Sequence, residues 1–180
     1  MYTGVRVGEA LALRWSDVNF TDKTVEVKKS AYLVRCDDNE EGDTHHYETE
    51  ITTTKTPSGN RTIYLPQRAL EMITLIRNKN CPEYMNESVF IKSVEDRTLI
   101  LARSLTNHLK YIERVEGFNV KDMGVHGLRH TFATMLFAAK IDIKTVSVLL
   151  GHATVDITYN TYVHLVKEQQ QCAMEALDNL

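Results

Sequence analysis

Five side chains in the C-terminal third of the sequence could together carry out chemistry on a phosphate ester. His126, Arg129 and His130 lie within five positions of each other, His152 follows a glycine, and Tyr162 comes ten residues later. A guanidinium binds phosphate oxygens in a forked geometry, and imidazoles exchange protons near neutral pH. A tyrosine oxygen can act as a covalent nucleophile. This set of residue types therefore favours nucleophilic attack on a phosphodiester.

Three short helices joined by tight connections would bring these side chains together. The first three lie three or four positions apart, so one helix places them on the same face. Asp142 can cap a second helix that runs to Leu150, and Gly151 is the residue type that commonly ends a helix. Asp156 can begin a third short helix that carries Tyr162. Apolar residues on the opposite faces predict a packed helical unit behind the polar groups.

Three stretches of the chain resemble motifs of one protein family. HGLRHTFAT, followed by LLGH and by a tyrosine ten residues after that histidine, is similar to the central motif of the tyrosine recombinases, the phage integrase family. TGVRVGEALALRWSDVNF resembles the first arginine motif of that family, and TKTPSGNRTIYLP resembles its lysine hairpin. The motifs occur in the family's order and cover most of the chain. The resemblance implies a site-specific DNA recombinase, the integrase of a prophage or of a conjugative transposon.

The resemblance further implies that DNA strands are cleaved and rejoined through a covalent 3′-phosphotyrosine. Tyr162 is the expected nucleophile, and His126 is expected to move its proton. Lys55 would protonate the leaving 5′ oxygen, although by itself it could equally be a lysine that protects a strand edge. Because the covalent bond retains the energy of the phosphodiester, no nucleotide cofactor is expected. No metal site is expected either.

Positive charge for the phosphate is expected from two arginines. Arg6 and Arg129 would hold the non-bridging oxygens and stabilise the transition state, and His152 would hydrogen-bond the phosphate. From the residues alone, Arg6 could equally be a surface arginine at a helix end, and the resemblance favours the catalytic role. Lys55 and Arg61 are predicted to contact DNA, Arg61 through a phosphate and without a catalytic role.

Other polar residues of the same region have competing interpretations. Tyr159 could share a helix face with Tyr162 and is the alternative nucleophile. Tyr162 is preferred because its distance from His152 and the Tyr-x-His ending resemble the family, which leaves Tyr159 a packing role. His130 is predicted to hydrogen-bond within the fold, with a direct role in the reaction as the less favoured alternative. His164 is expected to support the site from further out.

Composition describes an ordinary soluble globular protein. The 180 residues suffice for one domain, with 43% hydrophobic and 25% charged residues. No apolar run approaches the roughly 20 residues of a membrane span and no signal peptide opens the sequence, which predicts a cytoplasmic protein without a membrane partner. Three separated cysteines without metal-ligand spacing fit reduced thiols.

A net charge of −3 is unusual for a protein that binds DNA. The acidity is concentrated in residues 37–50, which hold seven acidic residues and no lysine or arginine. Without this segment the chain has a surplus of four basic residues. A basic face is therefore still available to DNA, and the acidic segment is expected to point away from it.

The remaining patterns predict a mixed α+β domain, mainly helical with a small antiparallel sheet at one edge, as in the catalytic domains of the family. Alternating apolar residues predict strands at 18–20 and 25–27, and the run 31–34 can extend the same sheet. Turn residues predict a hairpin over 48–65, with Lys55 near its tip. Helical spacing predicts two further helices, at 66–79 and 103–116.

Residues 1–180 are expected to form an integrase catalytic domain without the N-terminal DNA-clamping domain of the family. The reason is that the predicted short helix at 8–13 has no preceding helix to pack against. The resemblance implies double-stranded DNA attachment sites as the substrate and a homotetramer on DNA. A weak apolar stripe follows Tyr162. Whether this tail packs on its own domain or docks on a neighbouring protomer stays open.

Three other functions fit parts of the sequence. A metallohydrolase could use His126 and His130, which have the i, i+4 spacing of a zinc helix, with His152 as a third ligand. Gly127 stands where that motif has a glutamate, and Arg129 would put a cation beside the metal, so this alternative is unfavourable. A non-catalytic DNA-binding module could use the same helix pair but does not need the tyrosine. A type IB topoisomerase would use similar chemistry.

Overall fold

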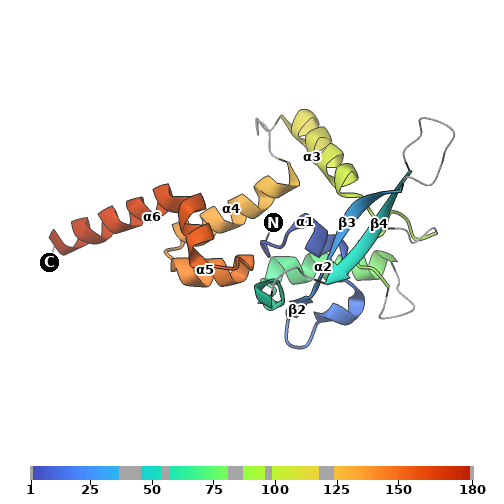
Figure 1. Cartoon of the computed structure of the whole chain (residues 1–180), viewed down its shortest axis with the longest axis horizontal. Coiled ribbons are helices and arrows are strands. Elements are labelled where there is room, and N and C mark those ends of the chain that lie inside the picture. The colour runs from blue at the N-terminus through green and yellow to red at the C-terminus, as the bar shows by residue number, and fades with distance from the viewer. Residues whose placement is uncertain are drawn as a thin grey trace.

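Helices make up more than half of the described residues, and short strands form two separate antiparallel sheets (Figure 1). The computed structural model describes residues 2–36, 46–53, 57–80, 87–95, 99–117 and 124–178. Within these ranges the helices are α1 (Val7–Leu11), α2 (Gln67–Asn80), α3 (Ala102–Glu116), α4 (Val125–Ala138), α5 (Ile143–Leu150) and α6 (Val155–Asp178). The strands are β1 (Val18–Asn19), β2 (Thr24–Val27), β3 (Lys29–Cys36), β4 (His46–Thr53) and β5 (Arg61–Tyr64). The predicted mainly helical α+β class is confirmed.

The three-stranded sheet, in the order β1-β2-β5, carries the first hydrophobic core. Val25 of β2 lies opposite Val18 of β1 and Ile63 of β5, and all three are buried. Trp15 and Ala69, the latter on α2, belong to the same cluster. Alternate residues of the strands therefore face this core, as the period of two in the sequence predicts.

The predicted hairpin over 48–65 is wrong in its strand pairing. β4 pairs along its whole length with β3, and β5 pairs with β2. The run 31–34 is therefore part of a second, two-stranded sheet instead of an extension of the first. Pairing with β2 buries Ile63 against Val25, burial that the threonine- and glutamate-rich β4 could not provide. Lys55 and most of the acidic segment lie outside the described residues.

The predicted helices are present, with small changes at their ends. α5 begins after Asp142, whose carboxylate accepts a hydrogen bond from the Thr145 amide at 2.9 Å, and ends at Gly151 in the left-handed conformation (φ 66°). The third helix is longer than predicted, because α6 continues to Asp178. Its backbone is non-helical at Tyr162 (φ −120°, ψ 24°), where two helical segments meet across a kink.

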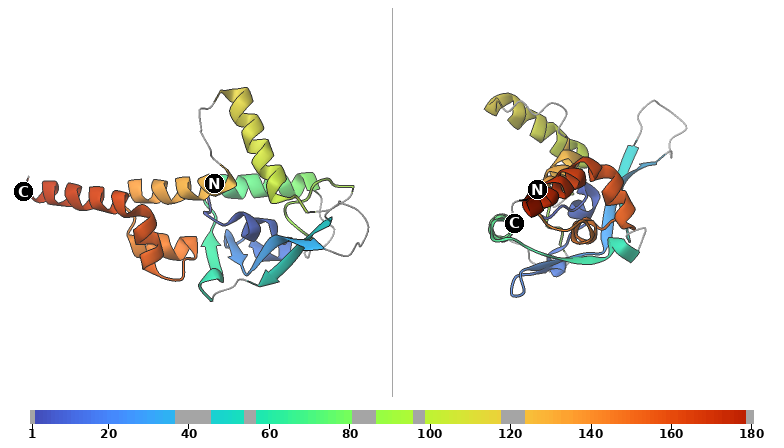
Figure 2. Two further views of the ribbon diagram at one scale, coloured as in Figure 1. Left: turned by 45° about the horizontal axis from the view of Figure 1, so that its top comes forward. Right: turned by 90° about the vertical axis from the view of Figure 1, so that its left-hand side faces the viewer.

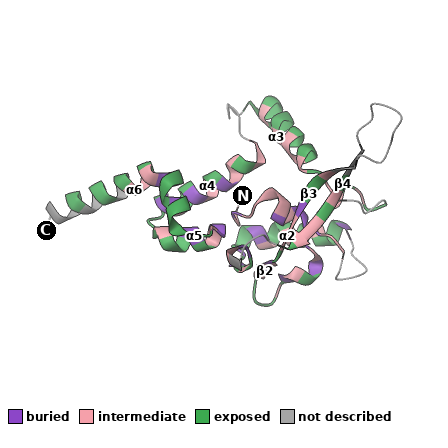
Figure 3. Cartoon of the chain, viewed as in Figure 1, coloured by how far each residue is buried: buried purple, intermediate pink, exposed green. Residues whose placement is uncertain are grey.

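Helices α4, α5 and α6 gather at one end of the molecule, and the strands lie toward the other (Figures 1 and 2). A second hydrophobic core joins these three helices, from Ala133, Phe137, Val146, Leu150 and Tyr162. The outer half of α6 extends away from the body, and α3 projects from it with no buried residue (Figures 1 and 3). In the described part of the chain, no helix combines the length and apolar character that a membrane crossing requires.

Candidate active site

Arg6 precedes α1 and points its guanidinium toward the end of α5. Its Nη1 forms an ion pair with Glu9 Oε1 at 2.8 Å, and its backbone amide donates to Glu9 Oε2 at 2.8 Å. Its Nη2 donates to the Gly151 carbonyl at 3.3 Å. The side chain is 43% exposed, so the guanidinium is held on one side and open to solvent on the other.

Arg129 of α4 is buried and bridges two distant parts of the chain. Its Nη1 donates to the Gly4 carbonyl at 2.6 Å, and its Nη2 donates to the Leu150 carbonyl at 2.7 Å. Burial, with the nearby charge of Arg6, lowers the pKa of Arg129 to about 10. The guanidinium therefore remains charged at neutral pH, in a fixed orientation.

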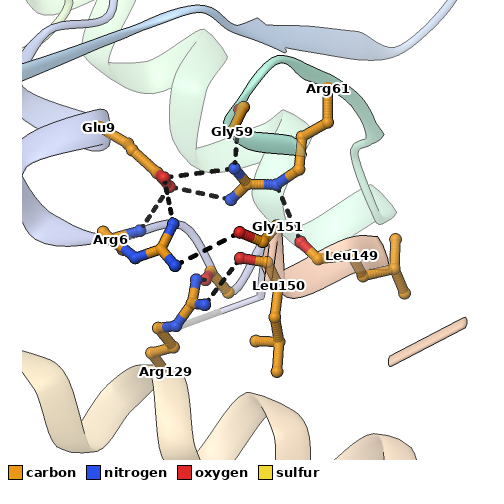
Figure 4. A network of polar contacts seen from close by, with 9 residues as sticks. Arg6, Glu9, Gly59, Arg61, Arg129, Leu149, Leu150 and Gly151 are labelled. Atoms are coloured by element: carbon orange, nitrogen blue, oxygen red, sulfur yellow. Dashed lines mark hydrogen bonds and ion pairs between the residues drawn. The ribbon is translucent and has the colours of Figure 1, made fainter. Parts of the chain in front are cut away.

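Glu9 and Arg61 form a buried ion pair beside these arginines (Figure 4). Arg61 Nη2 lies 2.8 Å from Glu9 Oε2, and the two side chains are 6% and 3% exposed. Burial opposes ionisation of Glu9, but hydrogen bonds and charge from Arg61 and Arg6 prevail and lower its pKa. Arg61 also donates to the Leu149 and Gly59 carbonyls, at 3.0 and 3.2 Å. This burial argues against the phosphate contact predicted for Arg61.

Three consecutive carbonyls at the end of α5 each accept from a different arginine. The carbonyl of Leu149 accepts a hydrogen bond from Arg61, that of Leu150 accepts from Arg129, and that of Gly151 accepts from Arg6 (Figure 4). The last carbonyls of a helix have no partner within it and carry partial negative charge, which suits cations. With one carboxylate, that of Glu9, drawn into this network, three guanidiniums leave a surplus of positive charge. The cluster is therefore suited to bind an anion at its open side, next to Arg6.

His152 follows this helix end and is neutral at physiological pH. Its Nδ1 lies 2.7 Å from Oγ1 of the fully buried Thr158, so Nε2 is the ring nitrogen left to meet a ligand. Burial and then the charges of Arg129 and Arg6 lower the pKa of His152 to about 4. A neutral imidazole that accepts from Thr158 at Nδ1 carries its proton on Nε2, where it can donate to an anion.

Tyr162 lies in the second core, at the kink of α6. The residue is 5% exposed, and its ring centroid is 5.5 Å from that of Phe137. Its hydroxyl lies 2.8 Å from Nδ1 of His130. Burial raises the pKa of Tyr162, while the charge of Arg129 acts in the opposite direction. The phenol is thus close enough to Arg129 for an electrostatic interaction, and it is protonated at neutral pH.

His126 lies one helical turn before His130 on α4 and contacts its ring. Its ring meets that of His130 edge-on, with centroids 4.7 Å apart and an interplanar angle of 84°. Burial and then the charges of His130 and Arg129 lower the pKa of His126. In this geometry the imidazole that contacts the Tyr162 hydroxyl is His130, the less favoured candidate from the sequence.

The structure brings together Arg6, Arg129, His152 and Tyr162, as the sequence predicts. Lys55, the sixth predicted site residue, lies outside the described residues. The rival tyrosine, Tyr159, is 41% exposed. Across the described residues, no group of three or more His, Cys, Asp or Glu side chains could hold a metal ion.

Sequence reasoning missed two residues of the site. Glu9 follows Arg6 by three positions, and this spacing is a signal that could have been used, because residues three apart share a helix face. Thr158 carries no comparable signal. Its contact with His152 depends on how the chain turns between α5 and α6.

Comparisons with known proteins match nearly the whole chain. The model of the Phage integrase family matches residues 1–169. A "Tyrosine recombinase XerC-like" protein of Caldanaerobacter subterraneus subsp. tengcongensis is 33% identical over 188 aligned positions, covering 99% of this chain and 47% of that protein. The ICEBs1 integrase of Bacillus subtilis is 25% identical, and the alignment covers 99% of this chain and 46% of the integrase. The chain therefore spans about half the length of these curated relatives.

Solved structures share the fold. The Tn1549 transposon integrase in complex with transposon right end DNA superposes with a TM-score of 0.75 at 23% identity, over 98% of this chain and 56% of that one. The XerA recombinase gives a TM-score of 0.66 at 22% identity, over 96% of this chain and 54% of the other. With a family match that covers nearly all of its length and carries the clustered arginines, histidines and tyrosine, the chain belongs to the phage integrase family.

Proposed function

We propose that this chain is the catalytic domain of a site-specific DNA recombinase, an integrase that cleaves and rejoins DNA through a 3′-phosphotyrosine at Tyr162. One observation carries the proposal: a surplus of fixed positive charge surrounds Arg129, whose charge acts on the phenol of the buried Tyr162. A module that only binds DNA would gain nothing from orienting this phenol. The relatives include recombinases and integrases, and the Tn1549 integrase is bound to DNA in its solved structure.

In this mechanism the arginines bind the scissile phosphate and stabilise the charge that develops on it. Arg6, at the open side of the cluster, and Arg129 would hold the non-bridging oxygens, while Nε2–H of His152 donates a further hydrogen bond. Tyr162 attacks phosphorus and displaces the 5′ oxygen, which Lys55 would protonate. The phosphotyrosine keeps the energy of the broken phosphodiester, so rejoining proceeds by the reverse attack without a nucleotide cofactor.

The substrate of this reaction is double-stranded DNA at the attachment sites of a mobile element. The matches to the ICEBs1 integrase and to transposon integrases support this origin. Recombination joins two duplexes, so the active assembly is proposed to be a homotetramer on DNA in the cytoplasm. The outer half of α6 extends from the body, and docking of this segment on a neighbouring protomer is the arrangement that we propose for it.

The proposal is tested with a pool of end-labelled randomised DNA duplexes, each nicked near the centre so that the cleaved fragment diffuses away. The protein, Tyr162→Phe and Tyr159→Phe are incubated with the pool in EDTA, and covalent adducts are separated on a denaturing gel. Adducts are expected with the unmodified protein and with Tyr159→Phe, and none with Tyr162→Phe. Tyr159 lies on the same helix and is exposed, which makes it a matched control.

Three other outcomes would point elsewhere. An adduct that survives Tyr162→Phe removes this residue as the nucleophile. DNA binding without any adduct favours a non-catalytic DNA-binding module. Relaxation of supercoiled plasmid by single molecules of the protein, without strand exchange between duplexes, favours a type IB topoisomerase.

A further inference from the structure

A second histidine of α4 lies in direct contact with the proposed nucleophile. Nδ1 of His130 is 2.8 Å from the Tyr162 hydroxyl, and the two ring centroids are 5.7 Å apart. The ring of His126 meets His130, edge-on at 4.7 Å. His130 is therefore the imidazole at the oxygen that must lose a proton when it attacks phosphorus.

One stripe along α4 explains why His130 reaches this oxygen. His130, Ala133 and Phe137 are spaced by three and four residues and so face the same side of the helix. Ala133 and Phe137 are buried against Tyr162, and the Phe137 ring lies 5.5 Å from the tyrosine ring. The phenol ring is thus fixed by apolar packing at one part of the stripe, which puts its hydroxyl at the imidazole one turn earlier.

We propose that Nδ1 of His130 accepts the proton of the Tyr162 hydroxyl during DNA cleavage. This step rests on the proposed function. The Tyr162 oxygen forms a bond to phosphorus, the bond from phosphorus to the 5′ oxygen breaks, and the phenolic proton passes to Nδ1. The leaving 5′ oxygen takes a proton from a separate donor, and the proton returns from Nδ1 to the phenol when the strand is rejoined.

The surroundings of the phenol make such an acceptor necessary. Burial raises the pKa of Tyr162, so the hydroxyl does not ionise by itself at neutral pH. Around this pair lie His126 and Arg129 of α4 and His152 beyond α5, each of which interacts electrostatically with His130 or with Tyr162. A neutral imidazole with its proton on Nε2 presents the lone pair of Nδ1 to the O–H group.

The decisive variant is His130→Asn. The side-chain amide oxygen of asparagine can lie near the position of Nδ1 and accept the hydrogen bond, but it cannot take up a proton. Single-turnover adduct formation on the nicked duplexes should slow by about 100-fold or more, the usual range for loss of a general base. DNA binding should stay unchanged, and so should the rate in His108→Asn, a matched exposed histidine on α3.

Fluorinated tyrosine at position 162 separates proton acceptance from simple positioning. Fluorine lowers the pKa of a phenol, so the attack depends less on a base. With fluorotyrosine, the 100-fold deficit of His130→Asn should shrink to less than about 10-fold. A structural defect would leave the deficit unchanged. A near-normal rate in His130→Asn with ordinary tyrosine overturns the proposal, and so does a fluorotyrosine-sensitive deficit that appears in His126→Asn instead.

A measurement without DNA tests the contact on its own. Tyrosine labelled with carbon-13 at Cζ gives one resonance per residue, and that of Tyr162 is identified by its loss in Tyr162→Phe. His130→Asn should shift this resonance, while His108→Asn should not. An unmoved resonance overturns the proposal. Absence of adduct with the unmodified protein, together with a shifted resonance, would instead count against the proposed function.

Discussion

At the scale of single residues, the carboxylate of Glu9 determines how the arginines are arranged. It is 3% exposed and contacts both Arg6 and Arg61, each at 2.8 Å. The shared carboxylate fixes the positions of the two guanidiniums and offsets the repulsion between their positive charges. The charge balance of the site therefore depends on a residue that itself need not touch DNA.

Replacing Glu9 by glutamine should destabilise the protein by about 3 kcal/mol, because removal of one partner leaves the buried charge of Arg61 uncompensated. Urea denaturation at neutral pH measures the free energy of unfolding. Glu26→Gln is the matched control, since Glu26 pairs with Lys28 at the surface, and it should change the stability little. Equal losses of unfolding free energy in the two variants would show that the buried ion pair contributes no more to stability than the surface pair.

His152 should make stability depend on pH. Its pKa is about 4 in the folded chain and near 6.5 when unfolded. Between these values the unfolded chain binds a proton that the folded chain does not, so stability falls as the pH falls from 6.5 to 4. Thermal unfolding at pH 7 and pH 5 should therefore show a smaller loss for His152→Asn than for the unmodified protein. His108→Asn should keep the full loss, and identical losses in all three proteins would contradict the assignment.

The residues with proposed chemical functions were easier to predict from the sequence than the residues that contact and orient them. Arg6, Arg129, His152 and Tyr162 have the side chains that phosphate chemistry needs, at spacings that a helix makes interpretable. The burial of Arg61 could not be predicted, because its carbonyl partner lies 88 positions away and its effect appears only after packing.

At the scale of elements, the end of α5 is the platform of the site. The three carbonyls at this end accept hydrogen bonds from the three arginines. Gly151 then turns the chain, and His152 follows directly. A Cβ at Gly151 would lie 2.6 Å from Nη1 of Arg61, so this turn leaves no room for a side chain. The helix end and the arginine cluster are therefore one structural unit.

Gly151→Ala should cost about 3 kcal/mol of stability and slow adduct formation, because it combines a left-handed residue with displacement of the Arg61 guanidinium. Gly117→Ala is a matched control: it also ends a helix with φ near 69°, but nothing lies within 4 Å of its added Cβ. That variant should cost about 1 kcal/mol, the backbone term alone. Chemical denaturation compares the two, and equal costs would show that the contact with Arg61 is unimportant.

Helices were predictable from the sequence where strand pairing was not. Asp142 and Gly151 mark the ends of α5 through local chemistry, so the sequence suffices. The partner of β5 is chosen by burial of Ile63 against Val25, a contact between segments far apart in the chain. The short connection between β4 and β5 favoured a hairpin of these two strands, but the burial of Ile63 against Val25 pairs β5 with β2 instead.

At the scale of the whole molecule, polar contacts join the two larger of the three hydrophobic clusters in the described residues. One core lies on the three-stranded sheet and α2, and the other lies among α4, α5 and α6. Arg129 connects the segment before α1 to the end of α5 through Gly4 and Leu150, and Phe132 packs against Gly4. The parts that carry Arg6 and Tyr162 are therefore aligned by the residues that are proposed to bind the phosphate.

Arg129→Lys should loosen this junction selectively. A lysine ammonium cannot span the Gly4 and Leu150 carbonyls as the planar fork does, so one carbonyl loses its donor. Amide hydrogen exchange in α5 should become about tenfold faster, while exchange in β2 and β5 stays unchanged, because the first core does not depend on this contact. Arg103→Lys, an exposed arginine on α3, should alter neither region. Uniform acceleration in both regions would mean that the two cores unfold as one unit, in which case the contacts of Arg129 with Gly4 and Leu150 do not form a separate junction between them.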